Sequence, residues 1–189
     1  RLEELEHVVL LDDVPIDATL PFSRLLEGEE APPAKTDDDA PALLHFTSGT
    51  TGPPKGALHG HGAIVAQRET ARTVLDLRPG DRYWCTADPG WVTGTVYGMI
   101  APLAAGATLL IDETDFQAER WLRILGEEDV DVWYTAPTAI RLLRRLPREE
   151  LARFRFPRLR LACSVGEPLD APSVLWGREV LGVPLHDTW

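Results

Sequence analysis

The sequence has few of the residues that mark disulfide-rich proteins, metal clusters or membrane spans. Its 189 residues include two cysteines, Cys85 and Cys163, each inside an apolar run and neither in a CxxC pair. This pattern favours two buried thiols in a reducing compartment over a disulfide, a cysteine nucleophile or a metal cluster. The longest apolar stretch, residues 98–111, is broken by Pro102 and Gly106 and is too short to cross a membrane.

Positive charge is also scarce, and lysine is nearly missing. The formal net charge is −11 at pH 7, so the surface repels phosphate backbones and we expect no nucleic-acid partner. The basic run Arg141–Arg160 is interpreted as a solvated helix face and loop. Only Lys35 and Lys55 are lysines among the 19 basic residues. No secretory signal is visible at the N-terminus, so we expect a cytoplasmic protein without a membrane partner.

What the sequence does contain is an alternation of strand-like and helix-like segments. Strands are predicted at residues 7–13, 42–47, 81–87, 107–111, 130–136, 159–165 and 184–188. Helices are predicted at residues 61–75, 94–104 and 171–181, with two more that begin at Asp115 and Pro137. Such alternation predicts an α/β fold with layered, parallel-rich sheets and flanking helices.

Two subdomains are predicted from this pattern. Residues 1–75 form the end of a first α/β subdomain, which includes an acidic, proline-rich surface loop at 14–40 and a phosphate loop at 47–56. Residues 76–189 form a second α/β subdomain. The chain starts at Arg1 within a helical pattern and stops just after a strand-like segment, so we expect a portion of a larger protein.

Four polar, glycine-bearing or proline-bearing motifs follow directly after predicted strands. They are TSGTTGPPKG at 47–56, ADPGWVTG at 87–94, TAPT at 135–138 and GEP at 166–168. Parallel sheets bind ligands at the carboxyl ends of their strands. We therefore expect the four motifs to share one edge of a sheet.

The segment Thr47–Gly56 has the composition of a phosphate-binding loop. Its glycines allow backbone N–H groups to face an anion, and Lys55 adds a compact positive charge. The spelling differs from a Walker A loop, because Lys55 is followed by Gly56 and not by Ser or Thr. A flexible linker is the alternative, but a linker has no need of a scarce lysine behind two prolines.

The run FTSGTTGPPKG at 46–56 resembles the signature loop of the adenylate-forming superfamily of acyl-CoA synthetases, peptide-synthetase adenylation domains and luciferases. The resemblance implies that the loop holds the β- and γ-phosphates of ATP while a carboxylate attacks the α-phosphorus. The implied phosphate-binding residues are Thr47, Ser48, Gly49, Thr50, Thr51, Gly52 and Lys55.

Residues 83–98 and 130–141 resemble the matching stretches of AMP-forming acetyl-CoA synthetases. The resemblance implies an acyl pocket formed by Trp91, Val92, Thr93 and Val165, and a CoA tunnel near Ala136. Residues 164–170 and 186–189 resemble two nucleotide-binding stretches of the family, which implies an AMP site formed by Gly166, Glu167, Pro168, Asp187, Thr188 and Trp189. Simpler alternatives are a turn aromatic for Trp91 and a carboxylate at a helix N-terminus for Glu167. A metal site at His59 and His61 is the less favoured alternative to a helix-entry role.

This resemblance implies ATP-dependent activation of acetate or another short-chain carboxylic acid to acyl-AMP, and transfer to CoA, with Mg²⁺ accompanying ATP. In the family, a polar TETG-like run and a smaller C-terminal domain with a catalytic lysine follow the stretch that matches this chain. We therefore assign no catalytic residue and no metal ligand within the chain, and we expect the chain alone to be inactive. The alternatives are a ligase for a different acid, including an aryl acid, and a non-enzymatic nucleotide-binding module.

Overall fold

The computed structural model describes residues 6–11, 16–47 and 52–188, and the chain divides into two compact units. The first unit, residues 1–36, contains a short parallel pair of strands, β1 (Val9–Leu10) and β2 (Leu20–Pro21), and the 3-10 helix η1 (Phe22–Glu27). The described part of the predicted surface loop at 14–40 has no buried residue, which agrees with the prediction, although it contains β2 and η1.

The buried strand predicted at residues 7–13 is only partly correct. Among its described residues, Val9 and Leu10 form a strand, but Leu11 is 81% exposed. Leu11 is exposed to solvent because the pairing of β1 with β2 covers only two residues. Residues 12 and 13 lie outside the described residues.

The second unit, residues 37–189, is built on a five-stranded parallel sheet with the order β6-β5-β7-β8-β9. The strands are β5 (Arg82–Cys85), β6 (Thr108–Leu110), β7 (Val132–Thr135), β8 (Leu161–Ser164) and β9 (Leu185–Asp187). All four pairings are parallel, which confirms the predicted α/β class. The central strand β7 is buried along its whole length, as expected for a parallel sheet covered on both faces.

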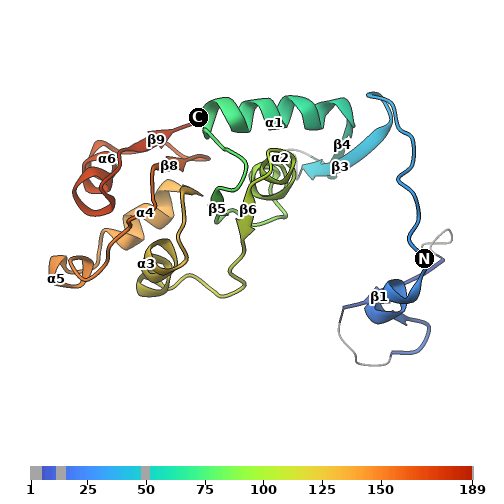
Figure 1. Ribbon diagram of the computed structural model, residues 1–189, viewed down its shortest axis with the longest axis horizontal. Helices are drawn as coiled ribbons and strands as arrows, with labels where there is room; N and C mark the ends of the chain where they lie inside the picture. Colours follow the sequence, from blue (N-terminus) through green and yellow to red (C-terminus); the bar gives the residue numbers. More distant parts are fainter. Residues whose placement is uncertain (1–5, 12–15, 48–51, 189) are drawn as a thin grey trace. The chain divides into compact units, whose positions relative to one another are not determined.

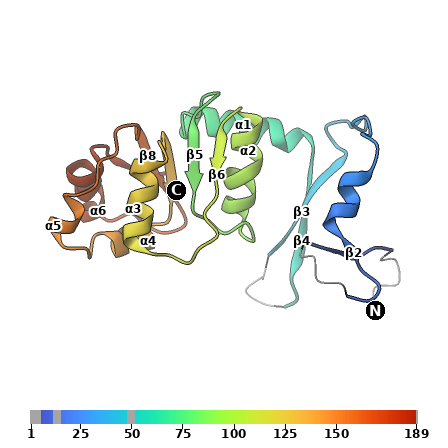
Figure 2. The same cartoon turned by 60° about the horizontal axis from the view of Figure 1, so that its bottom comes forward.

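Helices cover both faces of this sheet (Figures 1 and 2). Successive side chains of a strand point to opposite faces, so Tyr83 packs with Ala71 and Ala101, and Trp84 packs with Leu122 and Leu125. On the Tyr83 side lie α1 (Gly62–Val74), the π-helix η2 (Thr93–Ile100) and α2 (Ala101–Ala104). The Trp84 side carries α3 (Ala118–Glu127), α4 (Pro137–Leu143), α5 (Arg148–Leu151), α6 (Ala171–Trp176) and the π-helix η3 (Gly177–Leu181).

The helix starts follow local chemistry. Pro137 opens α4, as predicted, because proline needs no hydrogen bond from its nitrogen in the first turn. The side chain of Asp170 caps α6 by accepting a hydrogen bond from the backbone N–H of Ser173 at 2.8 Å. The start predicted for α3 at Asp115 is wrong by three residues, because Gln117 is still extended.

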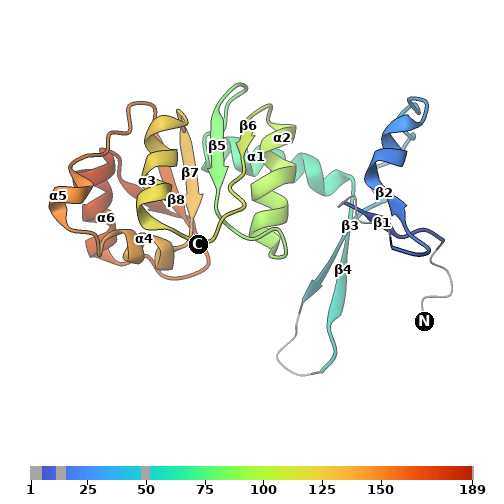
Figure 3. The ribbon, with the colours of Figure 1, turned by 90° about the horizontal axis from the view of Figure 1, so that it is seen from below.

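The phosphate-loop motif belongs to a separate two-stranded sheet, and here the prediction of one shared sheet edge is wrong. β3 (Pro41–Thr47) pairs antiparallel with β4 (Lys55–Gly60), as Figure 3 shows. The connection at residues 48–54 is too short for a parallel crossover, which needs about a dozen residues or more. We call β3 and β4 the phosphate hairpin. The subdomain boundary predicted after residue 75 falls inside the second unit and stays a prediction.

The two cysteines are free, and their environment agrees with the prediction of structural thiols. Cys163 is buried and Cys85 is half-buried. Burial raises the pKa of the Cys163 thiol to about 12 and also raises the pKa of the Cys85 thiol. Both thiols are therefore kept neutral at physiological pH. No helix among the described residues has the length and apolar character needed to span a membrane.

Candidate functional site

The carboxyl ends of β7, β8 and β9 bring two of the predicted motifs together. Ser164 at the end of β8 pairs with Asp187 at the end of β9. Beyond this pair, the N–H of Thr188 donates to the Ser164 carbonyl at 2.9 Å, and the N–H of Leu169 donates to Asp187 Oδ2 at 3.2 Å. The loop that contains GEP and the described residues 187 and 188 are thus joined by hydrogen bonds, although Leu169 and Asp187 are 18 positions apart in the sequence. Trp189 lies outside the described residues.

Tyr134 positions Thr188, a role that the sequence alone did not reveal. The Thr188 hydroxyl donates to the Ser164 carbonyl at 3.0 Å, and Tyr134 Oη lies 2.8 Å from the same hydroxyl oxygen. Because Thr188 has one hydroxyl proton, Tyr134 is the donor in the second bond. Burial raises the pKa of Tyr134 to about 12, so the phenol keeps its proton. Tyr134 lies in β7, just before the turn that follows this strand. Its side chain can contact Thr188, at the end of β9, because only β8 lies between β7 and β9 in the sheet.

The Glu167 carboxylate is held by α4. Its two oxygens lie 2.6 and 2.8 Å from Thr138 Oγ1, which donates its one proton to the carboxylate, and Oε2 also accepts a hydrogen bond from Arg141 Nη1 at 2.8 Å. Thr138 and then Arg141 lower the pKa of Glu167, so the carboxylate is ionised at neutral pH. The carboxylate lies at the first turn of α4, where the backbone of Thr138 also lowers its pKa, so the alternative of a carboxylate at a helix N-terminus applies to α4, whereas Asp170 caps α6. Gly166, with φ +91°, takes a left-handed conformation that suits glycine.

Arg141 and Arg144 fasten the 166–170 loop to α4, so the prediction of a solvated basic face is wrong for them. Arg141 donates from Nε to Asp170 Oδ2 at 3.0 Å and from Nη2 to the Pro168 carbonyl at 2.9 Å. Arg144 Nη1 pairs with Asp170 Oδ1 at 2.9 Å. Their spacing of three residues places both side chains on one face of the helix, which is the signal in the sequence that identifies them.

Two further arginines of the basic run are paired as well. Arg158 pairs with the buried Asp131 at 3.0 Å, and Arg160 reaches Asp76 at 2.7 Å. The prediction failed because a run of arginines looks the same whether its partners are water or distant carboxylates. Those partners lie up to 84 residues away in the sequence.

The phosphate hairpin brings Thr47 and Lys55 directly opposite each other at its described end. Residues on opposite strands of an antiparallel pair project to the same face, and alternate residues share a face. His45, Thr47, Lys55 and His59 therefore belong to one face of the hairpin. Gly52 has φ +106°, a conformation that few residues other than glycine adopt. Residues 48–51, which carry the other predicted phosphate ligands, lie outside the described residues.

A cavity of about 340 Å³ lies between this face of the hairpin and the turn that follows β5. It brings together Thr47, Trp91 and Val92, which the sequence assigned to phosphate binding and to the acyl pocket. Trp91 is 72% exposed and Val92 is 53% exposed, so this wall is open. The other predicted acyl residues, Thr93 and Val165, are not among the described residues that line the cavity.

Thr93, Val165 and Ala136 belong to other parts of the second unit. Thr93 begins η2, and Val165 packs against the core cluster that contains Tyr134 and Cys163. Ala136 follows β7 and is exposed. His45 and His59 also line the cavity, whereas His61 precedes α1 at its N-cap position. Within the described ranges, no group of three or more His, Cys, Asp or Glu side chains is arranged to hold a metal ion.

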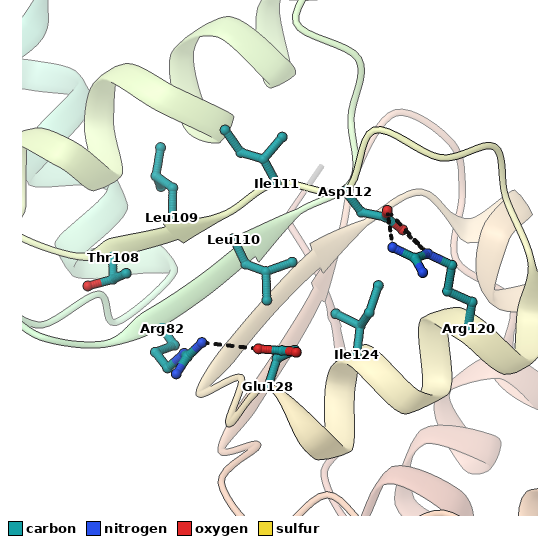
Figure 4. Close-up of a pocket in the computed structure, with 9 residues that line it drawn as sticks. All are labelled: Arg82, Thr108, Leu109, Leu110, Ile111, Asp112, Arg120, Ile124 and Glu128. Carbon is teal, nitrogen blue, oxygen red and sulfur yellow. Dashed lines mark hydrogen bonds and ion pairs between the residues drawn. The ribbon is translucent and has the colours of Figure 1, made fainter.

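A second cavity, of about 360 Å³, lies beside the edge strand β6 (Figure 4). Ion pairs stand at its two ends, Arg82–Glu128 at 3.3 Å and Arg120–Asp112 at 2.8 Å. Hydrogen bonds from Arg120 lower the pKa of Asp112 to about 2. No predicted site residue is among the described residues that line this cavity.

The sequence of this chain is similar to those of known proteins. The family model described as AMP-binding enzyme matches residues 1–189. The acetyl-coenzyme A synthetase of Bacillus subtilis (strain 168) is 50% identical over 147 residues, which cover 78% of this chain and 26% of that protein. The acetyl-coenzyme A synthetase of Parvibaculum lavamentivorans is 42% identical over 164 residues, covering 83% of this chain and 25% of that protein. The chain thus spans 26% or less of the length of these two relatives.

Two solved structures share the fold. A crystal structure of a Brucella canis acyl-CoA synthetase has a TM-score of 0.85 and 31% identity, covering 95% of this chain and 33% of that chain. A crystal structure of an anthranilate CoA ligase in complex with anthranoyl-AMP has a TM-score of 0.83 and 28% identity, covering 97% of this chain and 36% of that chain. Because the family model covers the whole sequence, this chain belongs to the AMP-binding enzyme family, the adenylate-forming acyl-CoA and acetyl-CoA synthetases.

Proposed function

We propose that the protein containing this chain activates acetate, or another short-chain carboxylic acid, and transfers it to CoA. The carboxylate attacks the α-phosphorus of ATP, giving acyl-AMP and pyrophosphate, and the CoA thiol then displaces AMP. Activation is needed because a carboxylate is a poor electrophile and AMP is a good leaving group. The chain spans 26% of the Bacillus subtilis relative, so the reaction belongs to the whole protein and we expect this chain alone to be inactive.

The observation that carries the proposal is the cavity that joins Thr47 of the phosphate hairpin with Trp91 and Val92. A carboxylate beside these two side chains would lie near the pyrophosphate end of ATP, where the attack on the α-phosphorus has to occur. Lys55 lies directly opposite Thr47 and supplies the positive charge that stabilises the departing pyrophosphate. The β-branched Val92 beside the indole of Trp91 favours a short acid.

The AMP moiety is proposed to lie at the carboxyl edge of β8 and β9. Gly166 offers close approach, since a Cβ added there would meet no atom within 4 Å. The Glu167 carboxylate is occupied by Thr138 and Arg141, so its backbone and that of Pro168 are the groups that would contact adenosine. Asp187, Thr188 and Trp189 would complete the AMP site. We keep Thr93 and Val165 as acyl-pocket residues and Ala136 as a residue near CoA.

Mg²⁺ would accompany ATP and balance the charge of its phosphates. Among the described residues no group of three acidic or imidazole ligands is arranged to hold it, so we assign no step to the metal in this chain. A cytoplasmic location stays a prediction.

An aryl acid is the second candidate substrate. The similarity in fold to an anthranilate CoA ligase favours it, together with the open wall formed by Trp91, which is 72% exposed. A ring could stack on this indole without being enclosed by the cavity.

A panel of acids tests the proposal in the full-length protein. The measurement is acid-dependent exchange of radioactive pyrophosphate into ATP, followed by CoA-dependent release of AMP. We expect acetate or propionate to give the highest kcat/KM, and benzoate and anthranilate to be at least 10-fold poorer. Higher activity with the aromatic acids would exclude the short-acid proposal. Failure of every acid to support exchange would favour a non-enzymatic nucleotide-binding module.

A further inference from the structure

A hydrogen bond connects the phosphate hairpin to the first turn of η2. His45 Nε2, in β3, lies 3.0 Å from Thr95 Oγ1, and both side chains are half-buried. The Thr95 hydroxyl also bonds to the carbonyl of Pro89. A carbonyl oxygen accepts and never donates, and Thr95 has only one hydroxyl proton. That proton is therefore used for Pro89, and His45 has to donate from Nε2.

This pattern requires a proton on Nε2 of the His45 ring. In the neutral imidazole the proton lies on Nε2 and leaves Nδ1 as an acceptor. The imidazolium form carries a proton on Nε2 as well, so the bond does not require either charge state. A donor at Nε2 is what the geometry needs, and this requirement can be tested by substitution.

The bonding partner of His45, Thr95, belongs to a compact turn that also contains Trp91. The N–H of Trp91 donates to the Asp88 carbonyl at 3.0 Å, and the N–H of Thr95 donates to the Trp91 carbonyl at 2.9 Å. A Cβ added to Gly94 would lie 2.0 Å from the Asp88 carbonyl oxygen, so the two sides of the turn are in close contact. A side chain that fixes the positions of Thr95 and Pro89 therefore also fixes the position of Trp91.

We propose that His45 is a positioning residue that sets the distance between the phosphate hairpin and the acyl-pocket turn. His45 is two residues from Thr47 on the same hairpin face, and both residues line the cavity with Trp91 and Val92. The inference rests on the proposed function of these two elements. Because reacting groups displaced by about 1 Å lose up to 100-fold in rate, loss of the bond should weaken the use of the acid.

Four substitutions in the full-length protein test this role. His45→Leu and Thr95→Val each remove the bond and keep much of the volume, whereas His45→Gln and Thr95→Ser keep a donor and a hydroxyl. We expect the first two to lower kcat/KM for the acid by roughly 10- to 100-fold with the KM for ATP within about twofold. The conservative pair should recover most of the activity. The double variant His45→Leu/Thr95→Val should be no worse than the poorer single variant.

Thr70→Val is the matched control. The Thr70 hydroxyl bonds to Tyr97 Oη at 3.0 Å, so it also links a neighbouring element to η2, but it does not hold the Trp91 turn. We expect the kinetic constants of this variant to stay within about twofold of those of the unsubstituted protein. A nitrogen-15 spectrum of this chain gives a structural readout, because the ring nitrogens of His45 should show the Nε2–H form, and Thr95→Val should change their shifts.

The outcomes separate the inference from the proposed function. If the unsubstituted protein exchanges pyrophosphate but His45→Leu retains its full kcat/KM for the acid, the role of His45 is overturned and the proposed function stands. Fully additive losses in the double variant, or a neutral His45 ring protonated only on Nδ1, also overturn it. A full-length protein that activates no acid overturns the proposed function, and the positioning role with it.

Discussion

The two parts of the candidate site are supported very differently. The AMP motifs extend from a parallel sheet with core side chains on both faces, where Trp133 and Leu122 are completely buried. The phosphate hairpin has two strands, and Leu44, Phe46 and Leu58 on its second face are 52%, 65% and 63% exposed. Two strands alone are marginally stable, so the position of the hairpin depends on a few side-chain contacts. The AMP end is therefore fixed by the fold, and the phosphate end by local bonds such as that of His45.

The largest effect should come from the core of the sheet. Leu122→Ala should lower the free energy of unfolding of this chain by about 2–5 kcal/mol, because it leaves a cavity in a fully buried cluster. Leu44→Ala on the hairpin should cost less than about 1 kcal/mol, since that side chain is already half in water. Urea unfolding of the two variants measures the contrast, and equal losses would show that the two regions are supported alike.

The next effect concerns charge on the hairpin. Lys55→Ala in the full-length protein should lower pyrophosphate exchange about 100-fold, because we propose that the ammonium group stabilises charge that develops on the leaving pyrophosphate. Lys35→Ala is the control. It removes the other lysine of the chain, which lies in the first unit. Unchanged exchange in Lys55→Ala would remove the hairpin from the candidate site.

A smaller effect on activity is expected from the contacts between α4 and the 166–170 loop of the proposed AMP site. Arg141→Ala removes the bonds to Glu167, Pro168 and Asp170, so the loop loses its fixed position. We expect the KM for ATP to rise about 10-fold with little change in the KM for the acid. Arg145→Ala, on the same stretch and exposed, is the control. Equal effects on both substrates would mean that Arg141 supports the fold as a whole.

The smallest effect lies at the edge strand. Hydrogen bonds from Arg120 lower the pKa of Asp112 from 3.8 to about 2. Because the pKa of the folded state is the lower one, this pair stabilises the chain above about pH 4, and the stabilisation disappears as the pH falls toward 2. The contribution is about 1 kcal/mol, since Arg120 is partly solvated.

Asp112→Asn should remove that part of the pH dependence, as measured by urea unfolding between pH 5 and pH 2. Asp115→Asn, which changes an exposed carboxylate of the same loop, should keep it. Identical acid profiles for the Asp112 variant and the unsubstituted chain would show that the ion pair is too solvated to contribute.

Much of the sheet follows from local patterns in the sequence. Buried runs such as residues 132–135 predict strands, and Pro137 predicts a helix start. β4 was missed because KGALHG contains two glycines and too few apolar residues to show an alternating pattern. The pairing of Arg158 with Asp131 was missed because it joins residues 27 positions apart.

The sequence by itself determined the class of the fold, the position of most strands and the motifs of the candidate site, because these depend on periodicity and on short runs of residues. Only the tertiary structure decided which motifs meet. The strand order brought Thr188 to Tyr134, and the antiparallel hairpin brought Thr47 to the cavity that contains Trp91. Contacts between distant residues depend on how whole elements pack, and local residue preferences carry no record of that arrangement.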